Sequence, residues 1–194
     1  MTNVESNVHV KVAMADVLAL LVISMFTFAV AAFGLGAKGD FSLLNLIVAL
    51  GQPVGIATLI AAVFAYMNEN ILGTAIFGPL AVFFLGVVTL GTSVPGLSSA
   101  SVLCMVIGII ILIDAIVALA QPVKLLPILL IIGAIAFFVT GLWYDGMIHG
   151  KGDDYRMAVG ALWLIYSLIS FYLAAGIMIL VMKGKAMLPL LIKA

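Results

Sequence analysis

Charged residues are scarce in this sequence. Only 8% of its 194 residues are Asp, Glu, Lys or Arg, whereas 66% are hydrophobic, and the mean hydropathy is +1.40. Soluble globular domains carry about 25% charged residues, so this composition excludes that class. Eight basic residues balance eight acidic ones, which gives a formal net charge of zero. That balance supports neither a nucleic-acid partner nor a polybasic patch for anionic lipid.

The residues that build disulfides, metal sites and catalytic centres are also scarce. The single cysteine, Cys104, excludes an intrachain disulfide and any cysteine-based metal cluster. The two histidines lie far apart in the sequence. A phosphate-binding glycine loop, an HExxH motif and a Gly-x-Ser-x-Gly elbow are all missing. We therefore expect neither an enzyme nor a chain that holds a metal ion or a cofactor.

Long apolar runs recur along the whole chain. Several exceed the roughly 18 residues that mark a membrane span, so we predict an all-α, polytopic membrane protein with a bundle of six transmembrane helices. The helices are expected at about residues 14–36, 41–66, 70–90, 100–120, 124–149 and 157–182. This domain, residues 14–182, is expected between a polar N-terminal tail over residues 1–13 and a C-terminal tail over residues 183–194. The first apolar run lacks a small-residue cleavage site after it, which indicates a retained span rather than a removed signal peptide.

Basic residues between the predicted spans indicate the orientation. With six spans both termini lie on one side of the membrane, and the loops and tails of that side hold five of the eight basic residues. The positive-inside rule then favours cytoplasmic termini in a cell (inner) membrane. The five are Lys11, Lys124, Lys183, Lys185 and Lys193, against Lys38, Lys151 and Arg156 on the other side.

One face of the second predicted span consists of small residues. Gly51, Gly55, Thr58, Ala62 and Ala65 follow one another at intervals of four, three, four and three residues, which places them on one helical face. Small residues let helix backbones approach closely in lipid, so we expect this face to contact another helix. A pore-lining face is the alternative.

Prolines fall inside the second and third predicted spans. Pro53 lies in the second, and Gly78-Pro79 lies near the middle of the third. Each proline removes a backbone hydrogen-bond donor, and in a membrane the freed carbonyl must be satisfied by protein or by a water-filled cavity. Two interrupted helices in one hairpin therefore predict a solute pathway.

Three ionisable residues are candidates for a proton-linked role. Asp114 lies within the fourth predicted span, where an unpaired carboxylate is costly to bury; a structural pair with Lys124 is the alternative. Asp145 and His149 lie one helical turn apart and could titrate together near neutral pH; a solvated helix end is the alternative.

Residues near the ends of the predicted spans have simpler interpretations. Trp143 and Tyr144 are expected to anchor the fifth span at the membrane interface. Residues 91–99 are predicted to form a polar loop, and residues 150–156 a charged aqueous loop.

The predicted hairpin resembles part of the acetate uptake transporter family. Between Gly55 and Phe84, a small-residue helix is followed by a segment similar to the family pattern Asn-Thr-Phe-Gly-x-Thr-Ala-Phe. Asn70, Gly73 and Phe77 keep their places in that pattern, and the threonine–alanine pair is shifted to Thr74-Ala75. Towards the C-terminus, Gly160, residues 171–176 and residues 188–190 resemble the closing segment of the family.

The chain departs from the family at three places. Residues 15–20 stand where the family has a proline-rich entry motif. Ala65 and Ile177 stand where the family has carboxylates near the end of the second span and in the last span.

The resemblance implies a function in transport. It implies a channel or transporter for acetate or a similar small monocarboxylate, assembled as a homo-hexamer in which each protomer has its own pore. It further implies a hydrophobic constriction at Ile23, Leu80 and Ile131, with Asn70, Thr74 and Phe77 contacting the solute beside it. A constriction of three aliphatic residues gates by dewetting. No nucleic acid is implied as a partner.

Two other functions are consistent with the same residues. One is a channel for urea, short-chain amides or another small neutral solute, built on the same six-span plan. The other is a structural subunit of a larger membrane complex, which the near absence of polar residues along the pore favours.

Overall fold

The computed structural model describes residues 15–36, 42–90, 94–183 and 188. These residues form six α-helices and no strand, which confirms the predicted fold class. Five of the helices are long and apolar enough to cross a membrane, and the third is apolar from Ile71 to Val87. The tail expected over residues 1–13 and most of the tail expected over residues 183–194 lie outside the described residues. The helices are α1 (Ala15–Leu35), α2 (Ser42–Met67), α3 (Ile71–Leu90), α4 (Val94–Ala118), α5 (Leu125–Ile148) and α6 (Gly152–Lys183).

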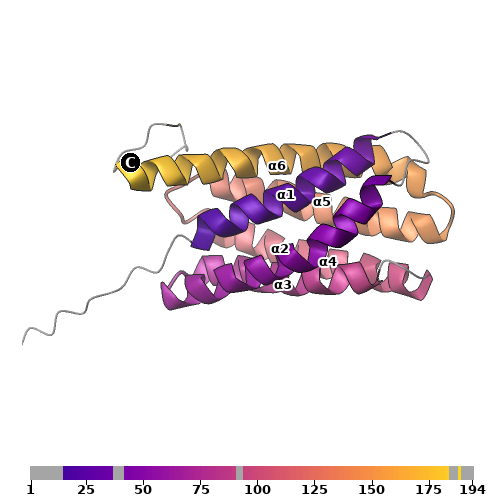
Figure 1. Ribbon diagram of the computed structural model, residues 1–194, viewed down its shortest axis with the longest axis horizontal. Helices are drawn as coiled ribbons and strands as arrows, with labels where there is room; N and C mark the ends of the chain where they lie inside the picture. The colour runs from indigo at the N-terminus through magenta and orange to yellow at the C-terminus, as the bar shows by residue number, and fades with distance from the viewer. Residues whose placement is uncertain (1–14, 37–41, 91–93, 184–187, 189–194) are drawn as a thin grey trace, which may run out of the picture.

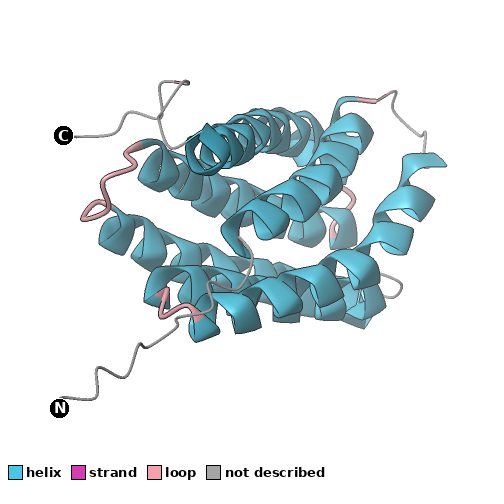
Figure 2. Cartoon of the chain, turned by 60° about the vertical axis from the view of Figure 1, so that its left-hand side comes forward, coloured by secondary structure: helices cyan, strands magenta, loops and turns pink. Residues whose placement is uncertain are grey.

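The six helices close into a ring in chain order. Each helix packs against the next one in the sequence, and α6 packs back against α1 (Figure 1, Figure 2). α1 begins and α6 ends at the same end of the bundle (Figure 1). Short connections between sequential helices make them antiparallel neighbours. The ring therefore encloses an interior whose two ends face opposite sides of the membrane.

α2 and α3 are continuous through their prolines. α2 passes through Pro53 and α3 passes through Pro79 without a break in the helix. The prediction of two interrupted helices is therefore wrong. A proline removes a single backbone hydrogen bond, and in a membrane the packing of neighbouring helices tolerates that loss.

α4 and α6 begin earlier than predicted. α4 already includes residues 94–99, which were predicted to be loop, and α6 includes residues 152–156. Pro95 lies in the first turn of α4, where its missing N–H costs nothing. Asp153 and Asp154 occupy the first turn of α6, where carboxylates interact favourably with the helix dipole.

The small-residue face of α2 is buried as predicted. Gly55 lies against Leu85 of α3, and a Cβ atom added at Gly55 would lie 2.7 Å from the Cγ atom of Leu85. The expectation that this face contacts a helix is therefore confirmed. The residues of the face, Gly51, Gly55, Thr58, Ala62 and Ala65, are all buried.

α1 and α6 touch backbone to backbone at a pair of glycines. A Cβ atom added at Gly34 would lie 2.5 Å from the Cα atom of Gly160, and one added at Gly160 would lie 2.7 Å from the carbonyl carbon of Gly34. No side chain fits between the two helices at this crossing. These two glycines therefore set the distance at which the ring closes.

Candidate functional site

Two cavities lie inside the ring, one towards each end. Cavity 1 has a volume of about 150 Å³ and lies where α1, α3 and α5 approach their C-terminal ends and α6 begins. Cavity 2 has a volume of about 170 Å³ and lies where α1, α3 and α5 begin and α6 approaches its end. Both are lined mainly by apolar side chains.

An apolar layer separates the two cavities. On α3, Leu80 lies between residues that line cavity 2 and residues that line cavity 1, and its side chain is only 2% exposed. Three other helices, α1, α5 and α6, also line both cavities. The change falls between Ile23 and Phe26 on α1, Phe77 and Phe83 on α3, Leu130 and Phe137 on α5, and Tyr166 and Trp163 on α6.

Aromatic rings pack edge to face along the cavity 1 side of this layer. The ring centroids are 4.8 Å apart for Phe26 and Phe84, 4.9 Å for Phe83 and Phe137, and 5.0 Å for Phe137 and Trp163. Phe83 and Phe84 contact each other as well, at 5.4 Å. T-shaped pairs of this kind contribute about 0.5–1.5 kcal/mol beyond the area they bury. The sequence analysis missed this cluster, because its members come from four different helices.

The structure separates the three residues expected to form the constriction. Ile23 is 3% exposed and lines cavity 2, and Leu80 is buried in the layer between the cavities. Ile131 instead lies on the outer face of α5, with 41% of its surface exposed. Consecutive residues of a helix point about 100° apart, so the neighbouring Leu130 faces cavity 2 while Ile131 faces away.

Asn70 joins the start of α3 to the start of α1. Its Oδ1 atom accepts a hydrogen bond of 2.9 Å from the backbone N–H of Gly73, which caps α3. Its side-chain amide donates to both carboxylate oxygens of Asp16, at 3.0 and 3.2 Å. Asn70, Asp16 and Phe77 all line cavity 2. The hydroxyl of Thr74 donates to the carbonyl of Asn70 at 3.0 Å, and Thr74 lines neither cavity.

The Asn70 contacts predict a stability effect. Asn70→Ala removes the cap and both donors to Asp16, so it should lower the free energy of unfolding by about 1–2 kcal/mol. Asn70→Ser retains a capping oxygen but is too short to reach Asp16, so it should lie between the wild type and the alanine variant. Thermal unfolding in detergent micelles, followed by circular dichroism, measures the order of the three. Equal melting temperatures for all of them would contradict the capping role.

Asp114 and Lys124 do not form the pair that was considered for them. Asp114 is 6% exposed, and its Oδ2 atom has no hydrogen-bond partner within the described part of the chain. The ammonium group of Lys124 instead donates to the carbonyls of Leu119, at 2.6 Å, and Gln121, at 2.8 Å. Lysine thus binds the carbonyls that follow the end of α4, where such groups lack helical partners.

Asp145 and His149 lie at the exposed end of α5. The Nδ1 atom of His149 is 3.7 Å from the Oδ2 atom of Asp145, and both side chains are more than half exposed. Neither residue lines a cavity. The geometry is that of a solvated helix end. Across the described residues, no group of three His, Cys, Asp or Glu side chains could hold a metal ion.

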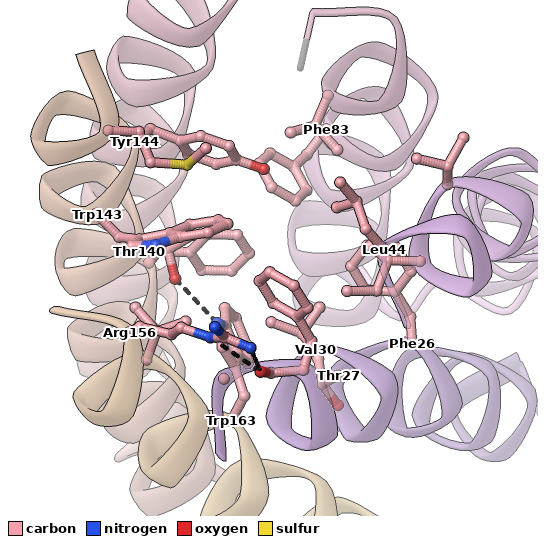
Figure 3. Close-up of a pocket in the computed structure, with 18 of the residues that line it drawn as sticks. Phe26, Thr27, Val30, Leu44, Phe83, Thr140, Trp143, Tyr144, Arg156 and Trp163 are labelled. Carbon is pink, nitrogen blue, oxygen red and sulfur yellow. Dashed lines mark hydrogen bonds between the residues drawn. The ribbon is translucent and has the colours of Figure 1, made fainter. Parts of the chain in front are cut away.

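Arg156 lines a cavity, which the sequence analysis did not predict. It was placed in an aqueous loop, but it lies in α6, is only 6% exposed and lines cavity 1. Its Nε and Nη2 atoms donate to the carbonyl of Phe33, at 3.2 and 2.8 Å, and its Cζ atom lies 4.5 Å from the centroid of the Phe33 ring (Figure 3). One feature of the sequence could have indicated its burial: Arg156 lies four residues before Gly160, so in a helix the two residues share a face.

Both tryptophans of the chain line cavity 1. The indole N–H of Trp163 donates to the hydroxyl of Thr140 at 2.9 Å, and this hydrogen bond spans α6 and α5 (Figure 3). Trp143 and Tyr144, which were expected to anchor the helix at the membrane interface, also belong to the wall of this cavity. Three of the four aromatic residues of α5, Phe137, Trp143 and Tyr144, therefore line cavity 1.

Comparison with known proteins identifies the architecture. No protein-family model matches the chain, and no curated protein matches it in sequence. A solved structure, that of the bacterial acetate channel SatP, matches with a TM-score of 0.79 over 92% of this chain and 98% of that chain. The chain has the fold of a bacterial acetate channel. The two sequences are 22% identical, and the match includes nearly the whole of both chains, so the shared architecture is not confined to the hairpin.

The fold likeness to SatP agrees with the resemblance of the sequence to the acetate uptake transporter family. Six apolar helices in this fold make the protein a multi-pass membrane protein.

Proposed function

We propose that the protein is a channel or transporter for acetate or a similar small monocarboxylate. The observation that carries the proposal is the likeness to the fold of the acetate channel SatP, in a chain whose own interior holds two cavities in line. Phe77 of cavity 2 and Phe83 of cavity 1 are six residues apart on α3, which is about 9 Å along a helix. A solute that enters either cavity therefore has a short apolar layer left to cross.

In this proposal the layer acts as a hydrophobic gate. Ile23 and Leu80 narrow the passage on the side of cavity 2, and the rings of Phe26 and Phe83 narrow it on the side of cavity 1. On α5, Leu130 takes the place in the gate that was expected for Ile131, because Leu130 faces the interior and Ile131 faces outward. A narrow apolar passage excludes hydrated ions by dewetting and admits a weakly hydrated solute when the side chains move. Asn70 and Phe77 contact the solute in cavity 2.

Uptake by proteoliposomes tests the proposal. Vesicles that contain the purified protein should accumulate radiolabelled acetate faster than empty vesicles of the same lipid, and excess unlabelled propionate should compete. Uptake no faster than in empty vesicles would refute acetate transport. Uptake of labelled urea or acetamide, with no acetate uptake, would favour the channel for neutral solutes instead.

The assembly and orientation belong to the same proposal. We expect a homo-hexamer in the inner membrane with both termini in the cytoplasm. Light scattering of the purified protein measures the number of chains in the assembly. Labelling intact cells with a membrane-impermeant thiol reagent, after a cysteine has been introduced into the N-terminal tail of the protein, measures the orientation. Stoichiometric copurification with other chains would favour a structural subunit of a larger complex.

A further inference from the structure

We propose that Asp16 is a specificity-determining residue of the pathway. Its carboxylate makes cavity 2 favour a neutral solute that donates a hydrogen bond, such as a short primary amide, over a carboxylate anion of the same shape. The inference rests on the proposed function, because it concerns which solutes the same pathway accepts. Asp16 belongs to residues 15–20, where this chain departs from the family pattern, so the selectivity is argued from this chain alone.

Asp16 places a negative charge at the outer end of cavity 2. Among the described residues that line this cavity, it is the only charged one. It lies in the first turn of α1, seven residues before Ile23, which is about 10 Å along the helix. Ile23 borders the apolar layer on the side of cavity 2. A solute that enters cavity 2 from this end of the bundle therefore meets the carboxylate before it reaches the gate.

Asn70 holds the carboxylate of Asp16 in place without neutralising its charge. The side-chain amide of Asn70 donates to both carboxylate oxygens, and its own oxygen is engaged by the backbone N–H of Gly73. An amide is a neutral donor, so the charge of the carboxylate is oriented but not cancelled. A carboxylate offers about four lone-pair positions, so Asp16 can accept a further hydrogen bond from a solute. Its place at a helix N-terminus also suits a negative charge.

No cation pairs with Asp16 within the described part of the chain. The ion pair found there joins His149 and Asp145, at the other end of the bundle. Lys124, the basic residue between α4 and α5, directs its ammonium group to backbone carbonyls at the end of α4 and does not line the cavity. An anion that enters cavity 2 therefore meets a like charge in apolar surroundings, where repulsion is stronger than in water.

The neutral polar side chains of cavity 2 serve either kind of solute. Tyr166 is only 6% exposed, and among the described residues its hydroxyl has no hydrogen-bond partner. Its ring is fixed by Trp163, at 5.4 Å between centroids, and by Gly133, where an added Cβ atom would lie 2.9 Å from the Cε2 atom of Tyr166. A hydroxyl can donate or accept, and so can the side-chain amide of Gln121. Only Asp16, which accepts and carries charge, distinguishes an amide from a carboxylate.

The size of cavity 2 selects the probes. Its volume of about 170 Å³ equals the share of about six water molecules in the liquid, which suits a four-carbon solute. Butyramide and butyrate have the same carbon skeleton and nearly the same shape, so they differ only in the charge and the donors of their polar end. They therefore test the role of Asp16 at constant apolar burial.

Saturation-transfer NMR of the protein in detergent, at neutral pH, measures the affinities for both probes. We expect butyramide to bind about tenfold or more tightly than butyrate, because the anion meets a like charge and brings no donor. Asp16→Asn removes the charge and keeps an oxygen for Asn70, so it should strengthen butyrate binding about tenfold and bring the two affinities close together. Asp16→Glu keeps the charge and should keep the preference for the amide.

Two further substitutions control for charge and for location. Glu69→Gln removes an exposed negative charge beside Asn70 that lines neither cavity, so it should leave the ratio of the two affinities unchanged. Tyr166→Phe removes only a hydroxyl, and Tyr166 lines cavity 2 alone. It should weaken both probes about threefold or more and leave their ratio unchanged.

Acetate uptake by proteoliposomes separates this inference from the proposed function. Asp16→Asn should raise the rate of uptake about tenfold, and a damaged fold does not produce such a gain. In wild-type vesicles that take up acetate, an unchanged rate in Asp16→Asn would overturn the role of Asp16.

The binding measurements decide the selectivity whatever the uptake. Equal affinities of the wild type for butyramide and butyrate, an unchanged ratio in Asp16→Asn, the same change of ratio in Glu69→Gln, or binding unaffected by Tyr166→Phe would each overturn it. A preference for the amide that depends on Asp16, in protein that moves no acetate with either residue at this position, would overturn the proposed transport and leave the site in cavity 2 standing.

Discussion

Gly160→Val is expected to destabilise the folded bundle by about 3 kcal/mol or more, at the upper end of the range for overpacked sites. A Cβ atom at this position would lie 2.7 Å from both the carbonyl carbon of Gly34 and the backbone nitrogen of Leu35. The colliding atoms are backbone, so no side chain can rotate away to relieve the contact. α1 and α6 would have to separate, and their contact is the one that closes the ring.

Gly86→Ala is the matched control for this substitution. Within the described part of the chain, a Cβ atom at Gly86 would meet only the Cδ2 atom of Leu103, at an ordinary contact distance of 3.8 Å. Since alanine is favoured over glycine within a helix by up to about 1 kcal/mol, this variant should be neutral or slightly more stable. Thermal unfolding and size-exclusion elution in detergent compare the two variants. Identical melting temperatures would show that α1 and α6 are not in backbone contact at Gly160.

Leu80→Trp is expected to lower acetate uptake by proteoliposomes at least about tenfold. Leu80 fills the apolar layer between the two cavities, and an indole ring there would narrow the passage further. A tenfold loss corresponds to about 1.4 kcal/mol in the barrier to passage. Protein interiors are close-packed, so the added atoms of the indole ring are expected to raise the barrier to solute passage by at least this amount.

Ile131→Trp is the control that separates blocking from a general effect of a large side chain. Ile131 was expected to belong to the same constriction, but it faces outward on α5, so a tryptophan there should leave uptake unchanged. Circular dichroism verifies that both variants retain the helical fold. Equal inhibition by the two substitutions would mean that solute does not pass the level of Leu80 within this ring.

The family resemblance placed an interior residue correctly on α3, at Leu80, but not on α5, at Ile131. The sequence motif around Asn70 fixed the register of α3, and Leu80 follows it at a short distance in the same helix. No comparable motif lies beside Ile131, and an error of one residue in a helix turns a side chain from the interior to the surface. In the folded bundle the buried face of α5 carries Leu130, Ala134 and Phe137, so Leu130 holds the interior position.

Local patterns in the sequence were sufficient for the helices themselves. Length and hydropathy predicted six apolar helices, because a span must satisfy every backbone hydrogen bond within its own segment and in lipid only a long apolar helix does so. The spacing of Gly51, Gly55 and Thr58 predicted a helix contact, because residues three and four apart share a helical face. The prolines misled the prediction, because the packing that tolerates them comes from other helices.

The tertiary structure alone decided which side chains meet. Phe26, Phe83, Phe137 and Trp163 form one contact network although they lie on four helices, and Arg156 reaches the carbonyl of Phe33, 123 residues earlier in the chain. In a chain so rich in apolar residues, hydropathy hardly distinguishes an inward face from a lipid-facing one, since both are apolar. The rotation of each helix is set by how closely it packs against its two neighbours in the ring, and that is a property of the assembled bundle.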